Sequence, residues 1–311
     1  MLQDKIAEIF MKVDDFCNLF IDELKSYEVL DNSETKRRNR KAGLCDSEII
    51  SLLIAFHGGQ FRNFKTFYTQ YVSVHLQKDF PCLVSYNRFI ELSPRSGIVF
   101  MLFLNHCCKG ECTGISFIDS TVLRVCHNKR IKRNKTFKGV AQLGKSSMGW
   151  FFGFKLHLII NDRGEIQSFY LTKGNVDDRD IKTITQMTKE LFGKLVGDKG
   201  YISKPLSDLL FGNGIQLITD VRKNMKSKAL SNEEKILIRK RSVIETVNDE
   251  LKNMCQVEHT RHRSISGFLI NVMGALAAYS FFPKKPSINK DVLETDQKKL
   301  NALQHQLLLA A

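Results

Sequence analysis

The sequence predicts an α/β domain with a mixed five-stranded sheet and helices, preceded by an all-helical N-terminal domain. Apolar residues recur at helical spacing, with almost no strand signal, over residues 1–110. From Gly114 the pattern changes to alternating and β-branched runs, which are typical of strands. With 311 residues and 43% hydrophobic content, the chain can form one sizeable core and a smaller unit. We therefore expect domains at residues 1–110 and 112–283, and a polar tail at residues 284–311.

The helical expectation for residues 1–110 comes from the spacing of apolar side chains. An amphipathic segment runs to about Leu24, and Asp46 is placed to cap a second, strongly apolar helix. Between them lies a basic run at residues 36–41, which is either a solvated loop or a phosphate contact. A further short helix begins at Ser85 with polar residues in its first turn, a pattern typical of recognition helices.

Five runs account for the expected sheet. Residues 115–121, 150–160 and 165–172 read as strands, and the short turn between the second and third makes these two an antiparallel hairpin. Shorter apolar strands follow at residues 194–197 and 215–221, each preceded by a helical segment. Three antiparallel strands followed by alternating helices and strands give the element order of the ribonuclease H-like fold.

Two helices close the second domain. Ser231 and Glu234 form a capping-box pattern for a helix that runs to about Met254. An apolar helix follows from Ser264 to Phe282. Its most apolar run, Gly267 to Phe282, is shorter than a bilayer span, contains Asn271 and ends at Pro283, so we expect a buried helix and no membrane association.

The composition indicates the partner and the compartment. The chain has 47 Lys and Arg residues against 33 Asp and Glu residues, a formal net charge of +14 at pH 7. Such a surplus attracts phosphate backbones through counterion release, so nucleic acid is the first partner to consider. Eight cysteines without regular pairing favour a reducing compartment, and no signal-peptide pattern is present at the N-terminus. A cytoplasmic location is therefore expected.

Two acids lie where strands of the predicted sheet bring them to one edge. Asp119 follows an apolar run in the first strand, and Asp198 follows the short strand that ends at Gly197. Ligands of open α/β sheets bind at the carboxyl ends of strands. Phosphodiester chemistry uses two hard cations held by clustered carboxylates, which makes this pair a candidate metal site. Taken singly, each acid is more often a turn or cap residue.

The helix that begins at Ser231 offers a third acid. At about 100° per residue, Arg241, Glu245 and Lys252 fall within about 40° of one another around the helix axis. Arg241 and Glu245 could instead form an ordinary surface ion pair. Asp249 competes with Glu245 as a metal ligand on the same face. The helix alone does not decide between these alternatives.

The spacing on this helix resembles a known signature. Arg241, three residues, Glu245, six residues and Lys252 match the end of the signature found in DDE transposases of bacterial insertion sequences. In that family the signature begins with tyrosine, where this chain has Ile238. The departure concerns the role of that side chain and leaves the acids in place.

Other segments carry the same resemblance, which covers about residues 112–282. Asp119 resembles the family's first acid, and residues 197–201 resemble the segment around its second acid. The strand at residues 153–160 and the segment at residues 174–180 are also similar to the family. The resemblance implies a ribonuclease H-like catalytic domain. The separate helical periodicity and the basic run of residues 1–110 predict a DNA-binding domain before it.

The resemblance implies a transposase that cuts DNA at the ends of an element with water and joins the freed 3′-hydroxyl to target DNA. Asp119, Asp198 and Glu245 would hold two Mg²⁺ or Mn²⁺ ions, and Arg241 and Lys252 would contact phosphate near the cut. The implied partners are the element's terminal inverted repeats and target DNA, bound by a homodimer assembled on DNA. The implied location is the prokaryotic cytoplasm, at the nucleoid.

A dense basic stretch lies between the first two predicted strands. Its members are Lys129, Arg130, Lys132, Arg133, Lys135 and Lys138. Because the stretch follows Asp119 closely, we expect a flexible loop that contacts DNA phosphates, the alternative being a solvated loop. His157, in the second strand, either points toward the acids or is a satisfied sheet histidine.

Two other functions fit the same acids and charge. A ribonuclease H-like nuclease or resolvase would use the acids without joining strands, and an inactive DNA-binding repressor would keep only the binding surface. The helical N-terminal domain favours recognition of a DNA site over cutting of RNA hybrids. Three intact acids argue against loss of activity.

Overall fold

The computed structural model describes residues 2–20, 43–221, 230–258 and 262–288. These residues divide into two compact units, one formed by the described part of residues 2–108 with 250–282 and the other by the described part of residues 109–249 with 283–288. The basic run at residues 36–41 and most of the expected tail, residues 289–311, lie outside the described residues.

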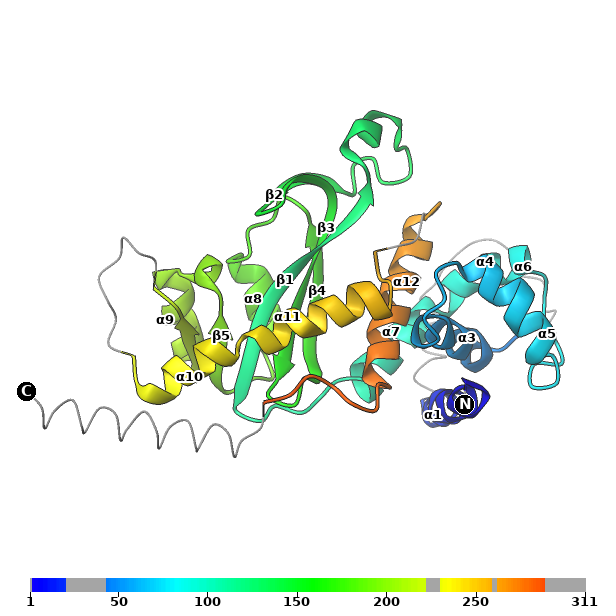
Figure 1. Ribbon diagram of the computed structural model, residues 1–311, viewed down its shortest axis with the longest axis horizontal. Coiled ribbons are helices and arrows are strands. Elements are labelled where there is room, and N and C mark those ends of the chain that lie inside the picture. Colours follow the sequence, from blue (N-terminus) through cyan, green and yellow to red (C-terminus); the bar gives the residue numbers. More distant parts are fainter. Residues whose placement is uncertain (1, 21–42, 222–229, 259–261, 289–311) are drawn as a thin grey trace, which may run out of the picture. The chain divides into compact units, whose positions relative to one another are not determined.

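The first unit is helical, as expected for the N-terminal part of the chain (Figure 1). It comprises α1 (Leu2–Leu19), α3 (Asp46–Gly58), α4 (Phe64–Thr66), the π-helical turn η1 (Phe67–Val72), α5 (Ser73–His75), α6 (Tyr86–Leu92), the 3-10 turn η2 (Ser93–Ser96), α7 (Gly97–Cys107), the π-helical turn η5 (Glu250–Met254) and α12 (Ile265–Ser280). Helix α3 begins at Asp46 itself, with Cys45 at the cap position, where its N–H donates to the Glu48 carboxylate. Across the described ranges, no helix is long and apolar enough to cross a membrane.

Helix α12 belongs to the helical unit although it comes late in the chain. Its residues 270–279 are all buried, and it packs against α3 and α7. A helix that is apolar on every side needs cover all round, which the helices of the N-terminal region provide. The division therefore differs from the expected boundaries, which assigned residues 250–282 to the second domain.

The second unit is built on a mixed sheet. Its strands are β1 (Ile115–Cys126), β2 (Gln142–Ser146), β3 (Gly149–Asn161), β4 (Ile166–Lys173), β5 (Gly193–Gly197) and β6 (Ile215–Thr219). Strand β3 pairs antiparallel with β1, β2 and β4, while β1, β5 and β6 are parallel neighbours. The order β4-β3-β1-β5-β6 is that of the ribonuclease H-like fold, so the expected fold class is confirmed.

The described part of the sheet has six strands, one more than expected. The additional strand, β2, contains a single large apolar residue, Leu143, and therefore shows no alternating pattern. It forms by pairing with the beginning of β3. Gly144 also lets β2 lie against the chain that follows β4, because a Cβ atom there would lie 2.0 Å from the carbonyl oxygen of Gly174.

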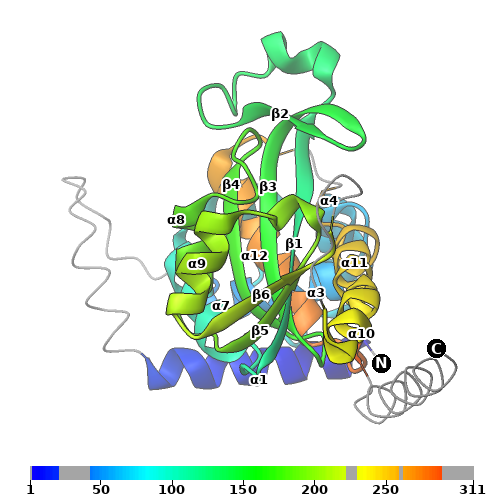
Figure 2. The ribbon, with the colours of Figure 1, turned by 90° about the vertical axis from the view of Figure 1, so that its left-hand side faces the viewer.

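Helices cover both faces of the sheet, as Figure 2 shows. The remaining elements of this unit are the 3-10 turns η3 (Asn128–Arg133) and η4 (Lys199–Tyr201) and the helices α8 (Ile181–Met187), α9 (Lys204–Gly212), α10 (Asn232–Lys240) and α11 (Ser242–Asp249). Helices α8 and α9 pack on the face that carries Ile118 and Ile159. Helix α11 packs on the opposite face of β1.

The expectation of one helix from Ser231 to Met254 is wrong. The capping box at its start is present, since Ser231 and Glu234 each accept a hydrogen bond from the other's backbone N–H. The helix then breaks at Arg241, where hydrogen bonds tighten to three-residue spacing. From Glu250 the chain forms a π-helical turn, with the Cys255 N–H bonded five residues back.

Candidate active site

Asp119, within β1, and Asp198, directly after β5, lie at the same register of two neighbouring parallel strands. Phe117 of β1 pairs with Val196 of β5, and each chain continues two residues further to an acid. Neighbouring strands of a sheet are about 5 Å apart. The two carboxylates therefore lie together at the carboxyl end of β5, where α/β sheets bind their ligands.

Asp198 is held by the turn that follows it. Its Oδ1 accepts a hydrogen bond of 2.8 Å from the N–H of Gly200, so it caps the 3-10 turn η4. Gly197 allows this turn to close, because a Cβ atom at that position would lie 3.0 Å from the ring of Tyr201. Asp198 is thus a cap residue and also a member of the acid pair. The two interpretations that the sequence allowed are compatible.

Asp119 is held by a residue that the sequence did not single out. Asn248 of α11 is 7% exposed, and its Nδ2 donates a hydrogen bond of 2.9 Å to Asp119 Oδ2. The Oδ1 atom of Asn248 is buried without a hydrogen-bond partner. Asn248 lies three residues after Glu245, one turn along the helix, and this spacing is the signal that could have found it.

Electrostatics links Asp119 to the other acids. The pKa of Asp119 is raised from 3.8 to about 6. Burial is the largest cause and the negative charges of Asp198 and Glu245 add to it, while the Ser120 backbone N–H and the charge of Arg241 oppose the shift. A carboxyl group is costly to ionise in such surroundings. An added cation would relieve that cost.

Glu245 lies on the exposed side of α11. Its Oε1 accepts a charge-assisted hydrogen bond from Arg241 Nη2, one turn earlier. The surface ion pair that the sequence left open is therefore present in this conformation. The third expected member of this face, Lys252, lies in the π-helical turn η5 and pairs with Glu258 at 3.7 Å. The regular 100° spacing that placed Lys252 beside Glu245 does not extend into that turn.

The three acids are of the residue type that binds magnesium, but in this conformation their side chains are not gathered around one point. The described ranges contain no set of three or more His, Cys, Asp and Glu side chains already gathered to hold a metal ion. Asp119, Asp198 and Glu245 nevertheless provide the hard oxygen donors that Mg²⁺ and Mn²⁺ prefer. The unpartnered amide oxygen of Asn248 belongs to the side chain that bonds to Asp119. Glu245 would complete the set only by leaving Arg241.

His157 lies on the other face of the sheet. It pairs with Ser120, the neighbour of Asp119, and side chains alternate between faces along a strand. Its Nε2 is 2.8 Å from Thr172 Oγ1, and burial lowers its pKa to about 4. The interpretation in which His157 points toward the acids is therefore wrong.

A partly buried polar network supports β1 from that second face. Asp178 accepts hydrogen bonds from Ser120 Oγ at 2.7 Å and from Lys155 Nζ at 3.0 Å. Lys155 also donates to the carbonyl oxygen of Val176. The network fastens the segment after β4 to the strand that carries Asp119.

The basic stretch is more regular than expected. Residues 128–133 form the 3-10 turn η3, in which His127 accepts a hydrogen bond from the N–H of Lys129. Phe137, directly before the last cation of the stretch, is buried against Phe154. The expectation of a flexible loop is therefore wrong for this segment, because a cap and an aromatic anchor hold it at its two ends.

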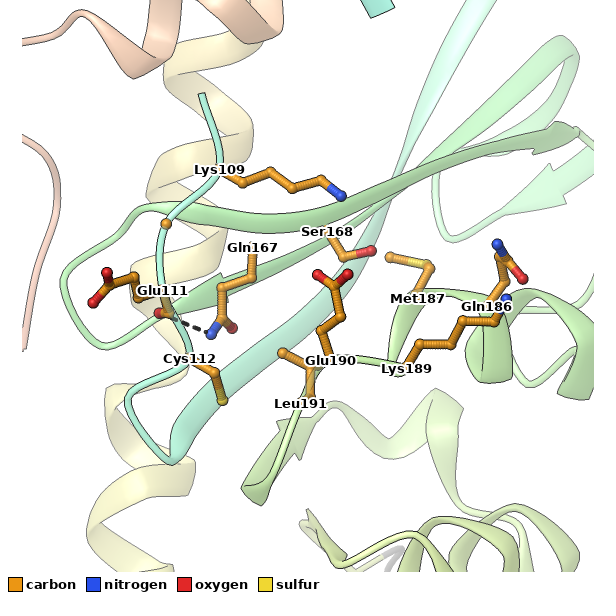
Figure 3. Close-up of a pocket in the computed structure, with 11 residues that line it drawn as sticks. Lys109, Glu111, Cys112, Gln167, Ser168, Gln186, Met187, Lys189, Glu190 and Leu191 are labelled. Carbon is orange, nitrogen blue, oxygen red and sulfur yellow. Dashed lines mark hydrogen bonds between the residues drawn. The ribbon is translucent and has the colours of Figure 1, made fainter. Parts of the chain in front are cut away.

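A polar depression of about 250 Å³ lies elsewhere in the unit (Figure 3). Lys109, Glu111 and Glu190 are among the residues that line it, and Gln167 Nε2 donates to the carbonyl oxygen of Glu111. Gln167 also bonds to Ser116, which shares the face of Ile118 and not that of Asp119. The depression is therefore separate from the acids. Both lysine and glutamate side chains line it, so it carries charges of both signs.

Comparison with known proteins identifies one family. The family model described as "Transposase DDE domain" matches residues 109–265, a span that includes all three acids. No curated protein matches the chain. Among solved structures, the piggyBac transposase synaptic complex with hairpin DNA is similar over 98% of this chain and 80% of its own, with 13% identity and a TM-score of 0.45. The Mos1 transposase paired-end complex with the left transposon end is similar over 65% of this chain and 66% of its own, with 11% identity and a TM-score of 0.23.

Proposed function

We propose, because this chain belongs to the DDE transposase family, that it cuts DNA at the ends of a mobile element and joins the freed 3′-hydroxyl to target DNA. One observation carries this proposal. Asp119 lies within β1 beside Asp198, which directly follows the paired strand β5, and the helix that carries Glu245 is bonded to Asp119 through Asn248. Carboxylates brought together in this way are what phosphodiester chemistry with divalent cations uses.

The acids take the roles of metal ligands in this proposal. Asp119 and Asp198 would hold two Mg²⁺ or Mn²⁺ ions, with Glu245 completing one coordination sphere. When bound, the ions would activate the attacking oxygen and stabilise the leaving oxygen. The Asn248 amide would keep the Asp119 carboxylate oriented, as hydrogen bonds from neighbouring groups commonly do for metal ligands.

Arg241 takes a phosphate-binding role that depends on Glu245. In the present conformation the guanidinium is engaged by the Glu245 carboxylate. When Glu245 turns toward the acids, Arg241 is released, and its planar fork suits a phosphate group. Lys252 remains a proposed phosphate contact on chemical grounds alone.

DNA is the proposed partner, in the form of element ends and target DNA bound by a homodimer in the prokaryotic cytoplasm. The net charge of +14 and the exposed lysines and arginines of residues 129–138 support the contact with phosphate. In the helical unit, α6 exposes Asn87 and Arg88 in its first turn and is the proposed recognition helix.

A strand-transfer assay tests the function. It uses the purified protein, DNA from the flanks of its gene, a target plasmid and Mg²⁺ or Mn²⁺. Joined products support a transposase, cutting without joining identifies a nuclease or resolvase, and binding alone identifies a repressor. Asp119→Asn, Asp198→Asn and Glu245→Gln should each abolish both steps, whereas the matched control Asp249→Asn should retain them.

A further inference from the structure

Trp150 occupies an unusual place for the chain's single tryptophan. It lies at the start of β3, beside the turn from β2, and is 58% exposed. Its cross-strand partner is Lys145, whose ammonium lies 5.7 Å from the centre of the indole ring. An indole exposed to this degree contributes little to the core, although aromatic side chains usually stabilise proteins by being buried.

The surroundings of Trp150 are cationic. The side chain of Asn128 donates a hydrogen bond of 2.8 Å to the carbonyl oxygen of Trp150, which fastens the turn η3 to the β2–β3 hairpin. Both Figures 1 and 2 show the segment after β1 beyond the same end of the sheet as β2. The exposed cations of this segment are Lys129, Arg130, Lys132, Arg133, Lys135 and Lys138. None forms an ion pair with an acid within the described ranges.

Trp150 lies on the same face of the sheet as Asp119. Leu158 of β3 is the cross-strand partner of Asp119, so the two side chains share a face. Side chains alternate between faces along a strand, and Trp150 precedes Leu158 by an even number of residues, eight, so the Trp150 side chain lies on that face as well. At about 3.3 Å per residue, the two positions are roughly 26 Å apart along the strand. DNA that reaches the acids along this face would meet the ring after roughly eight base pairs, at about 3.4 Å each.

We propose that Trp150 is a stacking platform for an unpaired base of DNA. The inference rests on the proposed function, which supplies DNA as the partner, and adds a binding site for DNA that contains an unpaired base. A base in a duplex has both faces covered by its neighbours, whereas an unpaired base offers a face to the indole. Aromatic rings beside lysine and arginine side chains are how proteins bind single-stranded nucleic acid. The uncompensated positive charge around the ring favours a nucleic acid over an apolar protein partner.

Intrinsic fluorescence tests the proposal directly, because Trp150 is the only tryptophan in the sequence. The probes are oligothymidine, a fully paired duplex of the same length, and that duplex with a central run of unpaired thymines. Fluorescence should fall, and its quenching by acrylamide should weaken, when the first and third probes bind. The fully paired duplex should change neither signal.

Two variants separate stacking from charge. Trp150→Ala should weaken binding of oligothymidine by about 5-fold to about 150-fold, the effect of losing one stacked base, and should leave the affinity for the fully paired duplex unchanged. Trp150→Phe should restore part of the loss. The matched control is Tyr170→Ala, because Tyr170 is an aromatic residue that is 41% exposed. It is the cross-strand partner of His157 and so lies on the face of the sheet away from Asp119 and Trp150. It should bind all three probes as the wild type does.

Several outcomes would overturn the inference. One is binding of oligothymidine, seen by fluorescence anisotropy of a labelled probe, without any change at Trp150. Another is a change in tryptophan emission with protein concentration alone, which would assign the ring to contact with a second copy. If the protein joins DNA strands while Trp150 stays accessible to acrylamide, only this inference fails. If it binds no DNA, the proposed function fails as well.

Discussion

Replacing Asp119 with asparagine should make the protein more stable at neutral pH while abolishing its activity. The pKa of Asp119 is raised from 3.8 to about 6, with burial as the largest cause. A carboxyl group whose pKa is higher in the folded protein than in the unfolded chain costs stability when it ionises. Asparagine carries no charge, and its side-chain oxygen can still accept the hydrogen bond from Asn248.

The size of the effect follows from the two pKa values. The difference between 3.8 and about 6 corresponds to at most about 3 kcal/mol in the free energy of unfolding. The cost of ionisation is fully present above pH 6 and disappears as the pH falls toward 4. Asp119→Asn should therefore gain up to about 3 kcal/mol at pH 7 and almost nothing at pH 4.

Urea denaturation of wild type and variant, with EDTA present and followed at several pH values, measures this difference. Other groups that titrate in the same range, such as His57 with its pKa lowered to about 4 by burial, contribute equally to both proteins and cancel. A variant that is less stable than wild type at pH 7, or a gain that does not change with pH, would refute the reasoning. The first result would mean that the Asp119 charge is already compensated in the protein without metal.

Three further predictions follow from the site and the two units. Asn248→Ala should lower the apparent affinity of the protein for Mn²⁺ by about 10-fold to about 100-fold, measured as Mn²⁺-dependent stabilisation in a thermal-shift titration. An unchanged titration would remove Asn248 from the site. A fragment of residues 1–108 should show little cooperative unfolding by circular dichroism, because it lacks α12, and a sharp transition would contradict the packing. Replacing Lys132, Arg133 and Lys135 with alanine should lower the slope of log affinity against log salt by about 2 to 3 on any DNA, whereas an unchanged slope would leave these side chains merely solvated.

The sequence by itself determined the features that depend on local pattern. Alternating apolar residues located β1, β3 and β4, and the capping box at Ser231 located the start of α10. An acid after each of two apolar runs identified Asp119 and Asp198. These signals are readable in a single chain because strand alternation, helix caps and strand ends each involve residues that are close in sequence.

The tertiary structure alone decided what depends on distant partners. Strand β2 has no pattern of its own and exists because β3 pairs with it. Helix α12 reads as a buried helix, but only packing against α3 and α7 assigns it to the helical unit. The contact of Asn248 with Asp119 joins residues that are 129 positions apart in the chain. Register and packing between such segments are set by the whole core, and a one-residue shift in either would turn these side chains to another face.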